Sequence, residues 1–320
     1  MIAWISNEKN YFKINYRRLK NNINVLKKEK DNEYFQYVIN LFDEYDLFLK
    51  KSINNSKLVF GNLITKYKNE IIDCSDDINL VRTCNLVLSS GHDSTYHVLK
   101  ALNNKKDKKV LVICIDMHLD AYDYNDELWK GNPFSKLIKE NYIKDFLTIG
   151  VPECKVKNSL ADVPKDIKEH VKIINENEIE KNIKKINPTN IFISIDIDCL
   201  NTRKYKITAT DYSPASILYN ISSIELCKQN SDIMLKQILD CIYIKNSLGY
   251  ANLYRVGENE MNFNKIKNII SITRKSCDKY GINLGFNYKN HIIGDITEIS
   301  GYDYGGFTSK IIVKLINELI

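Results

Sequence analysis

The chain lacks several features that mark common protein classes. Its 320 residues include only 12 glycines and 5 prolines, and no stretch rich in either divides the sequence. Little material is therefore available for a flexible hinge, and we expect residues 1–320 to form a single domain. The eight cysteines are dispersed and form no C-x-x-C pair. Zinc ribbons and dithiol redox motifs are therefore not indicated.

Long apolar runs and a basic block are also absent. No apolar run approaches membrane-spanning length, and the opening residues 1–5 are too short for a signal peptide. The simplest expectation is a reduced, cytoplasmic protein with no membrane partner. The net charge of +6 comes from scattered lysines, and the dense run 105–109 is interrupted by Asp107. Because no basic stripe studded with aromatics accompanies these lysines, we expect no nucleic-acid partner.

From residue 86 onward, the sequence pattern alternates between strands and helices. Short apolar, β-branched runs typical of buried strands are separated by segments with helical periodicity. This alternation predicts an α/β fold with a parallel sheet covered on both faces. The expected strands are 86–89, 110–116, 145–150, 190–196 and 291–298, and the expected helices are 95–102, 176–186, 215–228, 232–245, 264–280 and 308–319. Residues 1–80 differ: an amphipathic helix is expected at 35–42.

Two acidic runs stand directly after two of these strands. Asp116, His118 and Asp120 follow the strand at 110, and Asp196 and Asp198 follow the strand at 190. Ligands collect beyond the carboxyl ends of parallel strands, and alternation would place the side chains of each run on one side. Acids also cap turns, so one such run alone is weak evidence. Four converging carboxylates and an imidazole would require cations, and this donor set suits a divalent metal such as manganese. The pattern predicts a binuclear metal hydrolase.

Further motifs extend this pattern to a known family. Ser90-Gly91-His92-Asp93-Ser94, Gly131-Asn132-Pro133-Phe134 and Glu298 occur with the two acidic runs in an order that resembles the ureohydrolase (arginase/agmatinase/formimidoylglutamase) superfamily. The resemblance spans roughly residues 86–320, while residues 1–80 lack the usual glycine-rich opening and form a divergent N-terminal part. It implies a three-layer αβα sandwich around a mostly parallel sheet and two Mn²⁺ per chain. It also implies hydrolysis of a guanidino or formimidoyl compound by a homo-oligomer, commonly a trimer or hexamer.

The resemblance carries over the metal ligands by position. Five residues match family ligands directly: Asp116, His118, Asp120, Asp196 and Asp198. The sixth ligand is usually a His in a Gly-Gly-Asp-His-Ser motif, but this chain has the last pair reversed. We expect Asp93 to be the sixth ligand because the register of a short strand-to-helix turn is usually kept. His92 is the alternative, after a small backbone shift, and loss of one metal position is a third possibility.

The substrate-binding residues also follow from the resemblance. Glu298 matches the family Glu that receives the cationic guanidinium or amidine, and its carboxylate can pair a planar fork of N–H donors. Asp120 is expected to act catalytically by accepting and returning the proton. Lys130 and Asn132 are expected to bind substrate, with the loops at 122–132 and 203–213 setting its identity.

Two other readings stay open. The reversed His92-Asp93 pair and the unusual N-terminus are compatible with a catalytically inactive arginase-like protein that has a structural or regulatory role. A deacetylase-like amidohydrolase with one zinc would need only Asp116, His118 and either Asp198 or Asp196. The absence of paired histidines for its acid–base step counts against that reading. Metal stoichiometry separates all three.

Overall fold

The structure is a computed structural model of the chain. It describes residues 1–5, 20–21, 23–24, 27, 40, 70–122, 128–200, 205, 261–299 and 307–320. The helices expected at 35–42, 215–228 and 232–245 and the substrate loop at 203–213 lie outside the described residues, apart from isolated positions.

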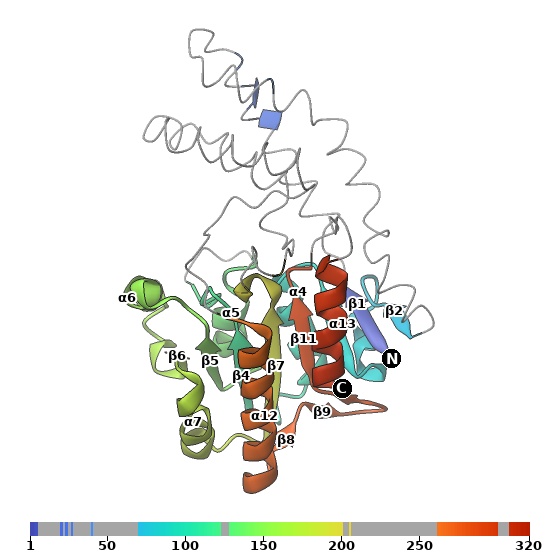
Figure 1. Ribbon diagram of the computed structural model, residues 1–320, viewed down its shortest axis with the longest axis vertical. Coiled ribbons are helices and arrows are strands. Elements are labelled where there is room, and N and C mark those ends of the chain that lie inside the picture. Colours follow the sequence, from blue (N-terminus) through green and yellow to red (C-terminus); the bar gives the residue numbers. More distant parts are fainter. Residues whose placement is uncertain are drawn as a thin grey trace.

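The described strands form a nine-stranded sheet in which every pairing is parallel. Its order is β2-β1-β3-β11-β7-β4-β5-β6, with β8 pairing β7 (Figure 1). A separate antiparallel pair joins β9 (Phe286–Asn287) to β10 (His291–Ile292). The strands of the large sheet are β1 (Ile2–Ile5), β2 (Ile71–Asp73), β3 (Leu86–Ser89), β4 (Val110–Ile115), β5 (Asp145–Ile149), β6 (Val171–Ile173), β7 (Asn190–Asp196), β8 (Asn283–Leu284) and β11 (Gly294–Thr297).

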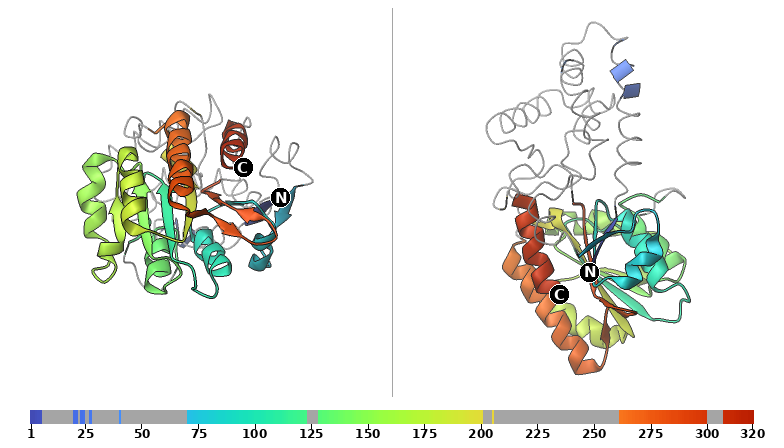
Figure 2. Two further views of the ribbon diagram at one scale, coloured as in Figure 1. Left: turned by 90° about the horizontal axis from the view of Figure 1, so that it is seen from below. Right: turned by 90° about the vertical axis from the view of Figure 1, so that its right-hand side faces the viewer.

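Helices cover both faces of this sheet, as the side view in Figure 2 shows. Alternate residues of β4 separate the two cores: Ile113 packs in one apolar cluster, while Val112 packs in the other. The first cluster also holds α7 (Ile179–Ile186), α12 (Phe263–Tyr280) and α13 (Phe307–Leu319), and the second holds α4 (Asp93–Leu102) and α5 (Pro133–Lys139). A further helix, α6 (Glu153–Ala161), follows β5. The predicted three-layer αβα sandwich around a mostly parallel sheet is therefore confirmed.

The structure differs from the sequence-based expectation in two places. The strand expected over 291–298 is divided between β10 and β11. At Gly294 a Cβ would lie 1.9 Å from the carbonyl oxygen of Ile193, so the two backbones approach too closely for any side chain. Strand β1 was not expected, because four buried apolar residues are too few to show a period. It lies between β2 and β3, so the first residues of the chain are part of the sheet.

Short 3₁₀ turns connect several of these elements: η1 (Ile78–Thr83), η2 (Lys168–His170), η3 (Glu176–Glu178) and η4 (Ile197–Cys199). The six cysteines in the described part of the chain are all free thiols, and only Cys154 is exposed. None of the described helices combines the length and the apolar character needed to cross a membrane.

Candidate metal centre

The two acidic runs meet because β4 and β7 are neighbours in register. Ile115 pairs with Ile195, so Asp116 and Asp196 come next, side by side, at the carboxyl end of the sheet. On the other side of β7, Thr297 of β11 pairs with Asp196, so that Glu298 follows at the same edge. Asp116, Asp196 and Glu298 therefore lie together at the carboxyl ends of three strands, as expected for a parallel sheet.

Within each run the side chains converge through turns, and the expected strand alternation is wrong. Strand β4 ends at Ile115, and Asp116 Oδ1 accepts a hydrogen bond of 2.7 Å from the backbone N–H of His118. Asp120 has a left-handed backbone with φ of 49°. In the second run, Asp196 Oδ1 accepts the backbone N–H of Asp198 at 2.8 Å. An acid at a strand end captures the N–H two residues later and starts a turn, so the strand does not continue.

The first group of donors, here the His92 cluster, comprises His92, Asp116, Asp120 and Asp196. His92 Nδ1 lies 2.7 Å from Asp120 Oδ2 and 3.4 Å from an oxygen of Asp116 and of Asp196. All four side chains are buried, and Asp120, 8% exposed, is the most accessible. One imidazole nitrogen facing three carboxylate oxygens is a donor set that fits a divalent metal such as manganese.

The second group, here the His118 cluster, comprises Asp116, His118 and Asp198. His118 Nδ1 lies 3.1 Å from Asp198 Oδ2 and 3.6 Å from Asp116 Oδ1. The side chain of His118 is 31% exposed, whereas that of His92 is 0% exposed. Asp116 belongs to both clusters, with Oδ2 toward His92 and Oδ1 toward His118. A carboxylate shared in this way is suited to bridge two neighbouring cations.

Asp93 lies in neither cluster whereas His92 lies among the carboxylates, so the geometry favours His92 over Asp93 as the sixth donor, and the sixth ligand stays a prediction. His92 precedes α4 with helical backbone angles, φ −62° and ψ −25°. Consecutive residues in helical conformation point about 100° apart, so only one of the pair can face the carboxylates. Asp93 instead turns toward Gly91, where its Oδ1 lies 2.6 Å from the position of a Cβ. Glu298 Oε1 lies 3.6 Å from that position, so Asp93 is directed to the same side of the site as Glu298.

Glu298 is a buried carboxylate next to the clusters. It is 2% exposed with φ of 58°, and neither carboxylate oxygen has a hydrogen-bond partner among the described residues. Burial raises its pKa to about 7, a shift that the nearby Lys130 opposes and Asp198 increases. A buried acceptor without a donor is costly unless a ligand supplies one. The absence of a side chain at Gly91 lets the Asp93 carboxylate approach there, since a Cβ would lie 2.6 Å from Asp93 Oδ1.

The loop before α5 brings Lys130 and Asn132 to the site with different surroundings. Lys130 is half-buried, and its charge opposes the rise in the pKa of Glu298. Asn132 is buried, and its Oδ1 accepts the backbone N–H of Trp129 at 2.9 Å. The Asn132 side chain thus shapes the loop, and its contact with substrate stays a prediction. Residues 123–127 of this loop lie outside the described residues.

The clusters carry an excess of acid. Burial raises the pKa of Asp196 well above its usual value, and the neighbouring Asp198 and Asp116 add to that rise. Burial alone would also raise the pKa of Asp116, but hydrogen bonds from His118 and His92 hold it well below the usual range. Burial would lower the pKa of His118, but Asp198 and Asp116 raise it well above its usual value. Charges of this density call for cations, which agrees with the donor sets.

One further side chain beside the His92 cluster was not expected. Cys114 Sγ lies 3.8 Å from His92 Nε2 and 4.0 Å from Asp116 Oδ2, and the side chain is fully buried. Its position two residues before Asp116 in a buried strand was the available signal, since alternate strand residues share a face.

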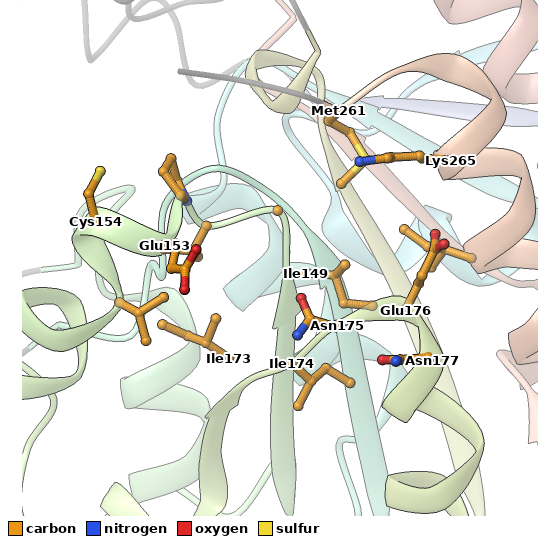
Figure 3. A pocket seen from close by; sticks show the side chains of 15 residues that line it. Ile149, Glu153, Cys154, Ile173, Ile174, Asn175, Glu176, Asn177, Met261 and Lys265 are labelled. Atoms are coloured by element: carbon orange, nitrogen blue, oxygen red, sulfur yellow. The ribbon is translucent and has the colours of Figure 1, made fainter. Parts of the chain in front are cut away.

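Away from the clusters, the described residues form a pocket that contains none of the cluster residues. Figure 3 shows this pocket of about 1150 Å³, with Glu153, Asn175 and Met261 among the side chains around it. It lies at the carboxyl ends of β5 and β6. None of the predicted site residues lines it.

Comparison with known proteins agrees with this arrangement. The Arginase family matches residues 17–210, which is more than half of the chain. The chain belongs to the arginase family. The matched region contains His92 and both acidic runs of this arginase-family chain, whereas Glu298 lies beyond it. No curated protein sequence matches.

Solved structures that match the chain include a formimidoylglutamase and two arginases. A formimidoylglutamase from Bacillus subtilis has a TM-score of 0.44 and 16% identity, over 83% of this chain and 66% of that one. An arginase from Medicago truncatula has a TM-score of 0.40 and 16% identity, over 80% and 61%. An arginase from Bacillus subtilis has a TM-score of 0.47 and 14% identity, over 84% and 90%. The chain thus spans slightly less than two thirds of the first two.

Proposed function

We propose that the protein is a binuclear manganese hydrolase that cleaves a C–N bond of a guanidino or formimidoyl compound. The observation that carries this proposal is the position of Asp116, whose two oxygens face two separate donor clusters, with the buried Glu298 beside them. Membership of the arginase family supports the same chemistry.

The chain's own residues would divide the metal-binding work. His92, Asp120 and Asp196 would hold one ion, His118 and Asp198 the other, and Asp116 both. When bound, the two divalent cations supply a hydroxide nucleophile at near-neutral pH. The burial of the His92 cluster keeps bulk water from its ligands.

Substrate binding and proton transfer would fall to residues at the edge of the clusters. Glu298 has two acceptor oxygens for the N–H groups of a planar cation and would orient its trigonal carbon toward the clusters. Asp120 would accept the proton of the nucleophile and return it to the leaving nitrogen. Its greater exposure within the His92 cluster supports that role. Lys130 would limit the negative charge around Glu298 and pair an acidic group of the substrate, with Asn132 shaping the same loop.

The test is a turnover screen with the manganese-loaded protein over guanidino and formimidoyl compounds, measuring urea, formamide and amine release. We expect turnover of at least one compound class, abolished in Asp198→Asn as the matched control. A protein that holds two ions per chain and hydrolyses no member of the panel would contradict the proposal.

The two other readings are less well supported by the geometry. The one-zinc amidohydrolase would use only the His118 cluster and leave the larger, more buried His92 cluster without a role. The hypothesis of an inactive protein drew on the reversed pair and on the unusual N-terminus, and the position of His92 among the carboxylates weighs against the first of these reasons. The homo-oligomer, trimer or hexamer, stays a prediction that light scattering of the purified protein can test.

A further inference from the structure

A chain of buried hydrogen bonds extends from the His92 cluster into the sheet. His92 Nε2, on the far side of the ring from the carboxylates, lies 3.0 Å from Ser194 Oγ. Ser194 Oγ donates to Asp295 Oδ1 at 2.6 Å, and Thr95 Oγ1 donates to Asp295 Oδ2 at 2.7 Å. All four side chains are fully buried. The mechanism above uses only His92 of this set.

The direction of the donors determines which ring nitrogen of His92 carries hydrogen. Ser194 has a single hydroxyl hydrogen, which it donates in its hydrogen bond to Asp295 Oδ1. Ser194 can therefore only accept from His92, so the hydrogen on that side sits on Nε2. Nδ1 is then the nitrogen that would bind a cation through its lone pair, and it is the one that faces Asp116, Asp120 and Asp196. Without a cation, Nδ1 donates to Asp120 Oδ2 at 2.7 Å, so a bound cation would displace that hydrogen.

We propose that Ser194, Asp295 and Thr95 are positioning residues that fix the tautomer and orientation of His92, so that Nδ1 binds metal despite the reversed His92-Asp93 pair. This inference rests on the metal centre of the proposed function. It assigns roles to three residues that make no contact with the clusters' metal-facing atoms.

The residues of this hydrogen-bond chain are held by three secondary-structure elements, β7, β11 and α4. Ser194 of β7 and Asp295 of β11 are direct partners in the sheet register, so the backbone sets their separation. Thr95 lies in the first turn of α4, the helix that begins immediately after His92. Asp295 thus ties the turn that carries His92 to the centre of the sheet. Hydrogen bonds of this kind to a metal-binding His typically change metal affinity 10- to 100-fold.

The first test compares metal binding by Asp295→Asn and the wild type, titrating Zn²⁺ into metal-free protein by calorimetry. An amide at this position no longer accepts from both hydroxyls, so the direction of the chain is lost. We expect one of the two sites per chain to weaken about 10- to 100-fold and the other to stay within about twofold. Thr95→Ser, which keeps the hydroxyl, is the matched control and should bind as the wild type does.

The second test reads the tautomer directly. In Zn²⁺-loaded protein labelled with ¹⁵N-histidine, His92 should show hydrogen on Nε2 and a metal-bound Nδ1, and His92→Gln identifies its signals. A wild-type His92 with hydrogen on Nδ1, or Asp295→Asn that binds both ions unchanged, would overturn the inference. Equal weakening of both sites with loss of folded circular dichroism would assign Asp295 a purely structural role and would overturn it too.

Neither test uses substrate. Wild-type protein that binds two ions and turns over nothing would therefore refute the proposed hydrolysis while leaving the role of Ser194, Asp295 and Thr95 intact.

Discussion

The two donor clusters share Asp116 but are built differently. The His92 cluster is enclosed, and its imidazole is held on the far side by Ser194. The His118 cluster is partly open, since the His118 side chain is 31% exposed and sits in the turn that Asp116 starts. The His92 cluster is thus closed and supported by the sheet, whereas the His118 cluster is open and supported by a turn. We expect the His92 cluster to maintain the geometry of the metal centre and the His118 cluster to contact solvent and substrate.

Removing the shared residue should have the largest effect. Asp116→Asn withdraws one carboxylate from both clusters at once, so we expect both ions to be lost or weakened and activity to fall by at least about 10³-fold. Elemental analysis and turnover of the desalted protein measure this. If Asp116→Asn keeps two tightly held ions, Asp116 does not bridge the clusters.

Separate removal of the two imidazoles would sharpen the comparison. His92→Ala and His118→Ala should each lower the metal content by one ion per chain and activity by about 10²- to 10³-fold. His92→Ala should also cost more stability, because it leaves a buried gap beside Phe134, whose ring centre lies 5.3 Å away. Metal content and thermal unfolding of both variants give the answer. Equal destabilisation of the two variants would contradict the distinction between a closed His92 cluster and an open His118 cluster.

Glu298 belongs to neither cluster, and its titration should make the stability of the protein depend on pH. Its pKa rises from 4.5 to about 7 on folding, so its contribution to stability is present below pH 4.5 and is lost as the pH rises through 7. Metal-free wild-type protein should lose up to about 3 kcal/mol from this group between acidic pH and pH 8.5. Glu298→Gln should be more stable than wild type at pH 8.5 and nearly inactive.

Urea unfolding of both proteins after chelator treatment, at pH 5.5 and pH 8.5, measures about 2 kcal/mol of that difference, because part of it is already lost between pH 4.5 and pH 5.5. Asp303→Asn, which changes an acid later in the sequence and outside the described residues, serves as the comparison variant. A wild-type pH dependence that Glu298→Gln leaves unchanged would show that this carboxyl does not titrate near 7.

The smallest effect is expected at Asp93. Because Asp93 lies outside both clusters, Asp93→Ala should keep the full metal content, in contrast to His92→Ala. Its direction toward the Glu298 side leads us to expect a change in KM of at most about tenfold. Loss of an ion in Asp93→Ala would restore Asp93 as the ligand and contradict the placement of His92.

The sequence was sufficient for the larger features. Continuous buried runs define the strands at 86–89 and 190–196 to the residue, and five of the six expected donors lie in the clusters. Whether residue 92 or 93 faces the carboxylates depends on where α4 begins, and one helical step decides it. The break falls at Ile293, between β10 and β11, and the close approach of Gly294 to Ile193 involves a distant strand, which no local pattern contains.

The most direct test of the account is the metal content per chain after manganese loading and thorough desalting. Two clusters joined by Asp116 predict two ions per chain in the wild type. One ion would mean that a single cluster is functional, and none would mean that the buried acids do not form a metal centre. Either result would contradict the binuclear site on which the proposed function rests.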